Sequence, residues 1–169
     1  QYTIKAQKKS VIAKGQRDLS KLASVNLNSN VTINSDLHMV LTQGNKTTVL
    51  TPNGVDEAYN WASLSPDGTK ILYYVSGKGC YTCDLHGRDI HYIALDCRAP
   101  QWYNNHIIVG MHDEDNGKWM TASAIVAYNM QGDKQILVNK ENMAVYPYTA
   151  NGKIAFSTIY GEIYLMNVK

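Results

Sequence analysis

The stretch Leu64–Tyr74, with the sequence LSPDGTKILYY, sets a Ser-Pro-Asp-Gly turn directly before a very apolar run. Proline fixes φ near −65° and glycine adopts positive φ easily, so this turn predicts a tight reversal between two strands. Similar units recur at Pro100–Val109, in a shortened form, and at Pro147–Phe156. The stretch therefore predicts a hairpin that the chain repeats along its length.

A second kind of turn, built on glycine, recurs with nearly constant spacing. Gly44, Gly87 and Gly132 stand 43 and 45 residues apart, and short β-branched or aromatic runs flank each of them. Together the two kinds of turn give four strands in about 44 residues, which is typical of a propeller blade. We expect an all-β fold, a β-propeller of four-stranded antiparallel blades. The residues expected in its core follow the first kind of turn: Ile71, Tyr73, Ile107, Val109, Ile154 and Phe156.

Blade number and ring closure are the open questions of this fold. Blades are expected at 58–97, 98–143 and 144–169, with an incomplete one ending near Gly54. The last blade has no outer strand, and Gln1–Ala6 alternates apolar and polar residues well enough to supply it. Residues 1–169 then form a single domain, in which the basic segment 1–28 is partly a closing strand. One alternative is a ring of four blades closed in this way, and the other is a fragment of a larger propeller.

Composition and charge narrow the class of protein. The chain has 169 residues, of which 44% are hydrophobic and 18% charged, as in ordinary soluble globular proteins. No apolar run approaches the roughly 20 residues that cross a bilayer, so no transmembrane segment is expected. Residues 1–24 carry a net charge of +5. Because no aromatic residue follows Tyr2 among these lysines, we expect a solvated terminus and no nucleic-acid partner. A monomer is expected.

Two segments carry a family resemblance. Ser65–Ile71 (SPDGTKI) and Gly161–Asn167 (GEIYLMN) resemble the repeats of TolB-type, WD-repeat-like bacterial β-propellers. Leu64 stands where that family usually has Trp, and the second copy of the turn lacks Ser-Pro-Asp-Gly. The resemblance implies an exported protein, periplasmic or secreted, with a protein or peptide partner in the cell envelope.

Catalytic motifs give no signal in the sequence. No Gly-x-Ser-x-Gly elbow, phosphate loop or dinucleotide fingerprint occurs, and the five His residues have no paired Ser or Cys motif. We therefore predict that the chain is not an enzyme, needs no cofactor and acts as a scaffold that binds a protein or peptide. The alternatives are a carbohydrate or small-ligand binding module and an accessory propeller of a larger hydrolase.

The three cysteines lie close together in the sequence, at Cys80, Cys83 and Cys97. On a strand, Cys80 and Cys83 point to opposite faces, which disfavours a zinc site. A hairpin about Gly87 places Cys80 diagonal to Cys97, within the distance of a disulfide. Unpaired thiols and a Cys80–Cys97 bridge both remain possible.

Two further groups of residues are weaker candidates for binding. The acidic loop around Asp113 and Asp115 resembles the first half of a calcium loop but lacks the distal Glu, so we expect an ordinary hairpin and no metal. Trp61 and Trp119 fall outside the repeat framework and are the candidate ligand-binding residues. Trp102 and Tyr148 occupy framework positions and are expected in the blade core, as are most aromatic residues at such positions.

Overall fold

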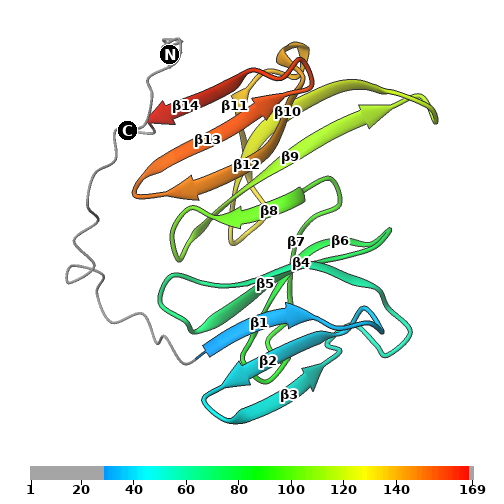
Figure 1. Ribbon diagram of the computed structural model, residues 1–169, viewed down its shortest axis with the longest axis vertical. Coiled ribbons are helices and arrows are strands. Elements are labelled where there is room, and N and C mark those ends of the chain that lie inside the picture. The colour runs from blue at the N-terminus through cyan, green and yellow to red at the C-terminus, as the bar shows by residue number, and fades with distance from the viewer. Residues whose placement is uncertain (1–28, 168–169) are drawn as a thin grey trace.

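The computed structural model describes residues 29–167, which form four antiparallel sheets in chain order (Figure 1). The first sheet consists of β1 (Ser29–Ile33), β2 (Met39–Gln43) and β3 (Lys46–Leu50). The second consists of β4 (Tyr59–Leu64), β5 (Lys70–Val75), β6 (Gly79–Asp84) and β7 (His91–Ala94). The third consists of β8 (Arg98–Trp102), β9 (Ile107–Asp115), β10 (Met120–Asn129) and β11 (Lys134–Val138). After the 3-10 turn η2 (Lys140–Asn142), the fourth consists of β12 (Ala144–Ala150), β13 (Lys153–Thr158) and β14 (Ile163–Asn167).

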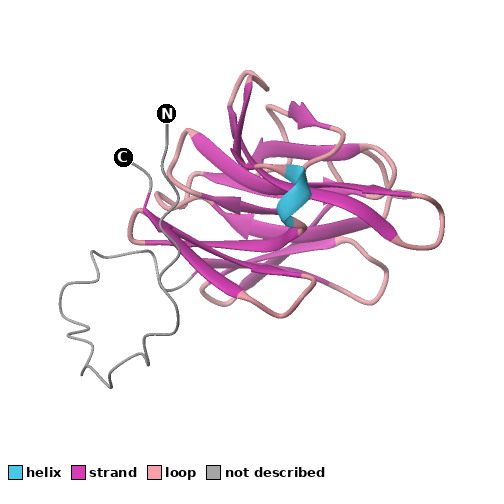
Figure 2. Ribbon diagram, turned by 90° about the horizontal axis from the view of Figure 1, so that it is seen from above, coloured by secondary structure: helices cyan, strands magenta, loops and turns pink. Residues whose placement is uncertain are grey.

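Each sheet is a meander whose neighbouring strands follow one another in the chain. Figure 2 shows strands throughout the described part of the chain, with η2 as its helical turn. The prediction of an all-β chain built from repeated antiparallel sheets is confirmed. The second, third and fourth sheets fall within the predicted segments 58–97, 98–143 and 144–169, and the first ends before Gly54.

The turn between β4 and β5, at Ser65–Thr69, is held by its own side chains. Ser65 is buried, and its hydroxyl donates to Asp67 Oδ1 at 2.6 Å while accepting the backbone N–H of Thr69 and Lys70. The N–H and hydroxyl of Thr69 also donate to Asp67 Oδ1, at 3.0 and 2.8 Å. Gly68 has φ 70°, the left-handed conformation that glycine adopts without strain. These contacts hold the pKa of the Asp67 carboxyl below its ordinary value, and the hydrogen bond from the Ser65 hydroxyl has the largest effect.

Both faces of the second and third sheets are buried, which explains the unbroken apolar run Ile71–Val75 after the turn at Ser65–Thr69. Every residue of Ile71–Val75 is buried. Ile71, Tyr73 and Val75 pack against the first sheet, whereas Leu72 and Tyr74 pack against the third. A third core lies between the third and fourth sheets. Alternation along a strand therefore serves two cores at once.

The first strands of the second, third and fourth sheets, β4, β8 and β12, are called the lead strands here. Trp102 Nε1 on β8 donates to the carbonyl of Ser63 on β4 at 3.3 Å, and the Thr149 hydroxyl on β12 donates to the carbonyl of Trp102. The lead strands thus lie next to one another, and the rest of each sheet extends from them.

Each lead strand contains a β-bulge with a left-handed residue that the sequence did not predict. These residues are Trp61, Ala99 and Tyr146, with φ of 50°, 45° and 50°. Positive φ is uncommon for residues other than glycine. Its recurrence at the same place in three sheets indicates a constraint of the repeat and not a local accident.

The described residues do not form a closed ring. The first and fourth sheets lie at opposite ends of the long axis (Figure 1), and contacts between sheets join each sheet to the next in chain order. The predicted closing strand Gln1–Ala6 lies outside the described residues. Blade number and closure therefore stay predictions. No helix in the described part of the chain is long and apolar enough to cross a membrane.

Most of the predicted core residues are buried, with two exceptions. Ile107 is only half-buried because it occupies the first position of its strand, where Lys70 and Lys153 stand in the neighbouring sheets. Its neighbour Ile108, which the sequence analysis did not name, is fully buried instead. Tyr148, expected in the core, is 66% exposed, whereas Trp102 is buried as predicted. Tyr148 points away from the core because the bulge at Tyr146 shifts the register of β12.

Core packing gives a direct test of these assignments. Ile154 is fully buried between the third and fourth sheets, so Ile154→Ala should lower the free energy of unfolding by about 2–5 kcal/mol. Ile163→Ala removes the same atoms from a residue that is 80% exposed and should cost less than about 1 kcal/mol. Urea unfolding measures both, and equal losses in the two variants would contradict the burial pattern.

The hydrogen bonds to Asp67 in the turn between β4 and β5 predict that stability depends on pH. Because the pKa of Asp67 is lowered by folding, its contribution to stability is present above the ordinary carboxyl pKa and is lost as pH falls through the lowered one. Ser65→Ala removes the first cause and should raise the pKa of Asp67 toward its ordinary value. An NMR titration of the Asp67 carboxyl carbon measures this shift, with Ser35→Ala, an exposed serine on another turn, as the control. An unchanged pKa in Ser65→Ala would refute the assigned cause.

Candidate functional site

A cleft lies where the three lead strands end. It has a volume of about 360 Å³ and is formed by the turns that follow β4, β8 and β12. Its walls are Pro66, Trp102, Tyr103, Asn104, Asn105, Thr149, Ala150, Asn151 and Gly152. These are the corresponding turns of three successive sheets, so the repeat itself brings them to one end of the molecule.

Hydrogen bonds between sheets fix the three turns relative to one another. The backbone N–H of Asp67 donates to Asn105 Oδ1 at 3.1 Å, which joins the second sheet to the third. The Tyr103 hydroxyl donates to the carbonyl of Gly152 at 3.1 Å, which joins the third sheet to the fourth. The cleft is therefore formed before any ligand binds, which reduces the ordering cost of binding.

The walls of the cleft combine apolar and polar surface, and the described residues that form them are uncharged. Asn104 Oδ1 accepts the backbone N–H of His106 and Ile107, both at 2.8 Å, and Asn105 Oδ1 accepts that of Asp67. Within residues 29–167, the amide nitrogens of Asn104 and Asn105 have no recorded protein acceptor, so each has N–H groups to offer. Among the described residues, no Lys, Arg, His, Asp or Glu lines the cleft. Such walls suit a ligand with neutral acceptors, such as peptide carbonyls or sugar hydroxyls.

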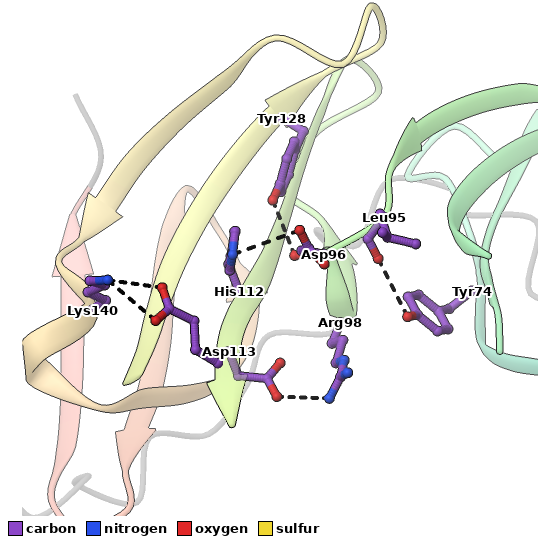
Figure 3. A network of polar contacts seen from close by, with 9 residues as sticks. Tyr74, Leu95, Asp96, Arg98, His112, Asp113, Tyr128 and Lys140 are labelled. Carbon is purple, nitrogen blue, oxygen red and sulfur yellow. Dashed lines mark hydrogen bonds and ion pairs between the residues drawn. The ribbon is translucent and has the colours of Figure 1, made fainter. Parts of the chain in front are cut away.

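A second polar group of residues lies at the far end of β9 from the cleft (Figure 3). Arg98 Nη1 donates to Asp113 Oδ2 at 2.8 Å, and Lys140 Nζ contacts Glu114 Oε1 at 3.0 Å. Only 6% of the Asp113 side chain is exposed, and its Oδ1 has no partner among the described residues. In this polar cluster each charge faces an opposite one, so it is chiefly a structural ion-pair group.

The same cluster holds the link between the second and third sheets. The hydroxyls of Tyr74 and Tyr128 donate to the carbonyls of Leu95 and Asp96, at 3.5 and 3.3 Å (Figure 3). His112 Nε2 lies 3.9 Å from Asp96 Oδ2. No three His, Cys, Asp or Glu side chains converge on a possible metal position within residues 29–167.

The sequence-predicted binding residues do not meet in one place. Asp113 is paired with Arg98, while Asp115 is exposed and accepts the N–H of Gly117 at 2.8 Å. Trp61 is 43% exposed at its bulge, with its ring edge-on to Tyr74 at 5.4 Å. Neither Trp61 nor Trp119 lines the cleft, so their roles in ligand binding stay predictions.

Trp119 lies on the hairpin between β9 and β10 and is 67% exposed. Lys118 Nζ lies 5.6 Å from the centre of its ring, so one ring face is shared with a cation. The cleft asparagines were missed because each reads locally as an ordinary turn residue. Only the alignment of three turns in space gives them a common role.

The cysteines are placed as strand alternation predicted, and all three are buried free thiols. Cys80 and Cys97 lie in the core between the second and third sheets, where burial and a hydrogen bond to Cys97 raise the pKa of Cys80 well above its ordinary value. Cys83 faces the first sheet, and burial raises its pKa to about 12. The Cys80–Cys97 bridge stays a prediction, which mass spectrometry of the alkylated, unreduced protein decides: one labelled thiol supports it and three reject it.

No protein-family model matches the sequence, and no curated protein matches it. The structure is similar to that of oligogalacturonate lyase in complex with manganese, with a TM-score of 0.56 and 14% sequence identity. That lyase is a seven-bladed β-propeller related to TolB-like propellers. The match covers 77% of this chain and 43% of the lyase, so the chain spans less than half of its length. At this identity the likeness shows the fold alone, which is propeller-like.

The likeness overturns one sequence-based prediction. The absence of hydrolase, phosphate-loop and dinucleotide motifs led to the prediction that the chain is not an enzyme, yet the similar structure is that of an enzyme. A lyase needs none of those motifs, so their absence could not exclude catalysis. The prediction is wrong as an inference from sequence, since propeller-like folds of this kind carry catalytic sites.

Proposed function

We propose that the cleft at the ends of the lead strands binds a short, uncharged stretch of a peptide or protein partner. The observation that carries this proposal is the set of uncharged hydrogen-bonding groups on three turns locked to one another. A volume of about 360 Å³ is near the lower end of the range for ligand pockets, which suits a few residues of extended chain.

The chemistry of the walls favours a peptide over an acidic sugar. The amide nitrogens of Asn104 and Asn105 can donate to peptide carbonyls, and within residues 29–167 no basic side chain lines the cleft to pair with carboxylates. The name of the similar lyase points to an acidic oligosaccharide as its substrate. Trp102 is buried and its Nε1 is already bonded, so it offers no flat face on which a sugar ring could stack.

We also propose that the repeats are of the TolB type and that the protein acts in the bacterial cell envelope, periplasmic or secreted. The support is the resemblance of Ser65–Ile71 and Gly161–Asn167 to that family. A carbohydrate-binding role remains the second candidate, because Trp61 and Trp119 are exposed aromatic residues of the kind that contact sugars.

The test uses selection from a phage-displayed library of random heptapeptides. Enriched peptides should bind the intact chain and bind Asn105→Asp at least about fivefold more weakly, as expected for loss of one hydrogen bond of about 1 kcal/mol. Asn105→Asp keeps the oxygen that accepts the Asp67 N–H but replaces the donating amide. Asn139→Asp makes the same change on an exposed residue next to η2, outside the cleft, and is the control.

Isothermal titration calorimetry gives the affinities. Peptides that bind the two variants equally well would contradict the cleft as the site. If no peptide is enriched and a neutral oligosaccharide array gives binding that Trp61→Ala or Trp119→Ala abolishes, the carbohydrate role replaces the peptide role.

A further inference from the structure

The fourth sheet presents an uncovered apolar face on the side away from the third sheet. We call this the outer face of the fourth sheet; it is made of Tyr148, Ala155, Ser157, Ile163 and Leu165, with Lys153 and Asn167 at its edge. Tyr148, Ala155 and Leu165 form one cross-strand row, and Ser157 and Ile163 form the next. Ile163 is 80% exposed, Tyr148 66% and Leu165 60%. An exposed patch of large apolar side chains commonly marks an interaction site.

Strand register shows what this face corresponds to in the other sheets. The last residues of β2, β6, β10 and β14 are Gln43, Asp84, Asn129 and Asn167, and the residues four positions earlier are Met39, Cys80, Ile125 and Ile163. The first three of these have no exposed surface, because each packs against the following sheet. The outer face of the fourth sheet is therefore the fourth copy of an interface that the chain covers three times.

The first sheet has the complementary kind of face uncovered. Its outer face consists of two cross-strand rows, Thr32, Val40 and Val49 in one and Asn30, Thr42 and Thr47 in the other. Val40 and Thr42 stand where Tyr81 and Cys83 of the second sheet pack against the preceding sheet. Val49 is 56% exposed. The outer face of the first sheet carries no charged side chain, and that of the fourth carries only Lys153, in the row with Asn167 at its edge, from which a flexible side chain can keep its ammonium in water.

We propose that two copies of this chain associate head to tail, with the outer face of the fourth sheet of one copy packed on the outer face of the first sheet of the other. The contact continues the series of sheet-on-sheet interfaces already present three times in each chain. Two such contacts between two copies would close a ring of eight sheets, which lies within the range of known propellers.

A second copy fits these faces better than the other possible occupants. The first and fourth sheets of one chain lie at opposite ends of its long axis (Figure 1), so they do not cover each other. The segment 1–24 carries a net charge of +5, which suits a largely apolar face with Lys153 at its edge poorly. The proposed dimer replaces the monomer expected from the sequence. It is independent of the peptide cleft, because none of the residues named for the two outer faces lines the cleft.

The test is the mass of the full 169-residue chain by light scattering after size exclusion and by sedimentation velocity, at about 1 to 100 μM. The expected mass at the upper end is twice the chain mass of 18.9 kDa. Ile163→Lys and Val49→Lys should each weaken the dimer at least about tenfold, because each places a charge in the shared contact. Ile136→Lys is the matched control: Ile136 is 57% exposed on β11, outside both outer faces, and its variant should remain a dimer.

Thermal unfolding of each variant shows whether it is folded. A wild-type chain that stays monomeric at every concentration overturns the proposal, and so does a dimer that Ile163→Lys leaves intact. A dimer that Ile163→Lys breaks but Val49→Lys does not would mean that two fourth sheets pack on each other, which also overturns head-to-tail stacking. If the peptide test fails while the dimer follows the expected pattern, only the proposed function is lost.

Discussion

Burial of both faces of a sheet is the constraint on which the rest of this structure depends. In β5 the side chains of Ile71–Val75 alternate between two cores, so that each face of the strand is covered by apolar side chains of a neighbouring sheet. A sheet with two apolar faces is stable only between two other layers of the fold. Here those layers are sheets, which are stacked in series, and within residues 29–167 one face at each end of the series is left uncovered.

Four buried tyrosines both fill the cores and tie one sheet to the next. The chain has twelve Tyr and one Phe. The rings of Tyr59, Tyr73, Tyr74 and Tyr128 fill the cores, while their hydroxyls reach the segments that link one sheet to the next. Tyr59 and Tyr73 bond to the link at Asn53 and Gly54, and the other two bond to that at Leu95 and Asp96. Burial raises the pKa of Tyr59, Tyr73 and Tyr128, so these hydroxyls stay protonated at pH values at which an ordinary tyrosine begins to ionise.

The features that could be predicted from the sequence are those fixed by residues that are neighbours in the chain. The turn at Pro66–Gly68 and the glycine turns depend on residues that are neighbours in the chain, so both the repeats and the sheet boundaries were predictable. The bulges at Trp61, Ala99 and Tyr146 were not, because left-handed φ at such residues is imposed by tertiary packing and has no signal of its own. The cleft was missed for a related reason: Asn105 matters through its bond to Asp67, a residue of the preceding sheet.

The two ends of the third sheet differ in a way that separates structure from recognition. At one end, Arg98 and Lys140 each pair with a carboxylate and His112 lies near that of Asp96, so these groups already have partners inside the protein. At the other, the turns after the lead strands use only the oxygens of Asn104 and Asn105 to hold the backbone. The amide nitrogens of these two side chains, neither of which is buried, have no acceptor among the described residues. Because a donor that the protein already holds in place costs little to order when a ligand binds, this favours the proposed cleft over the ion pairs as a binding site.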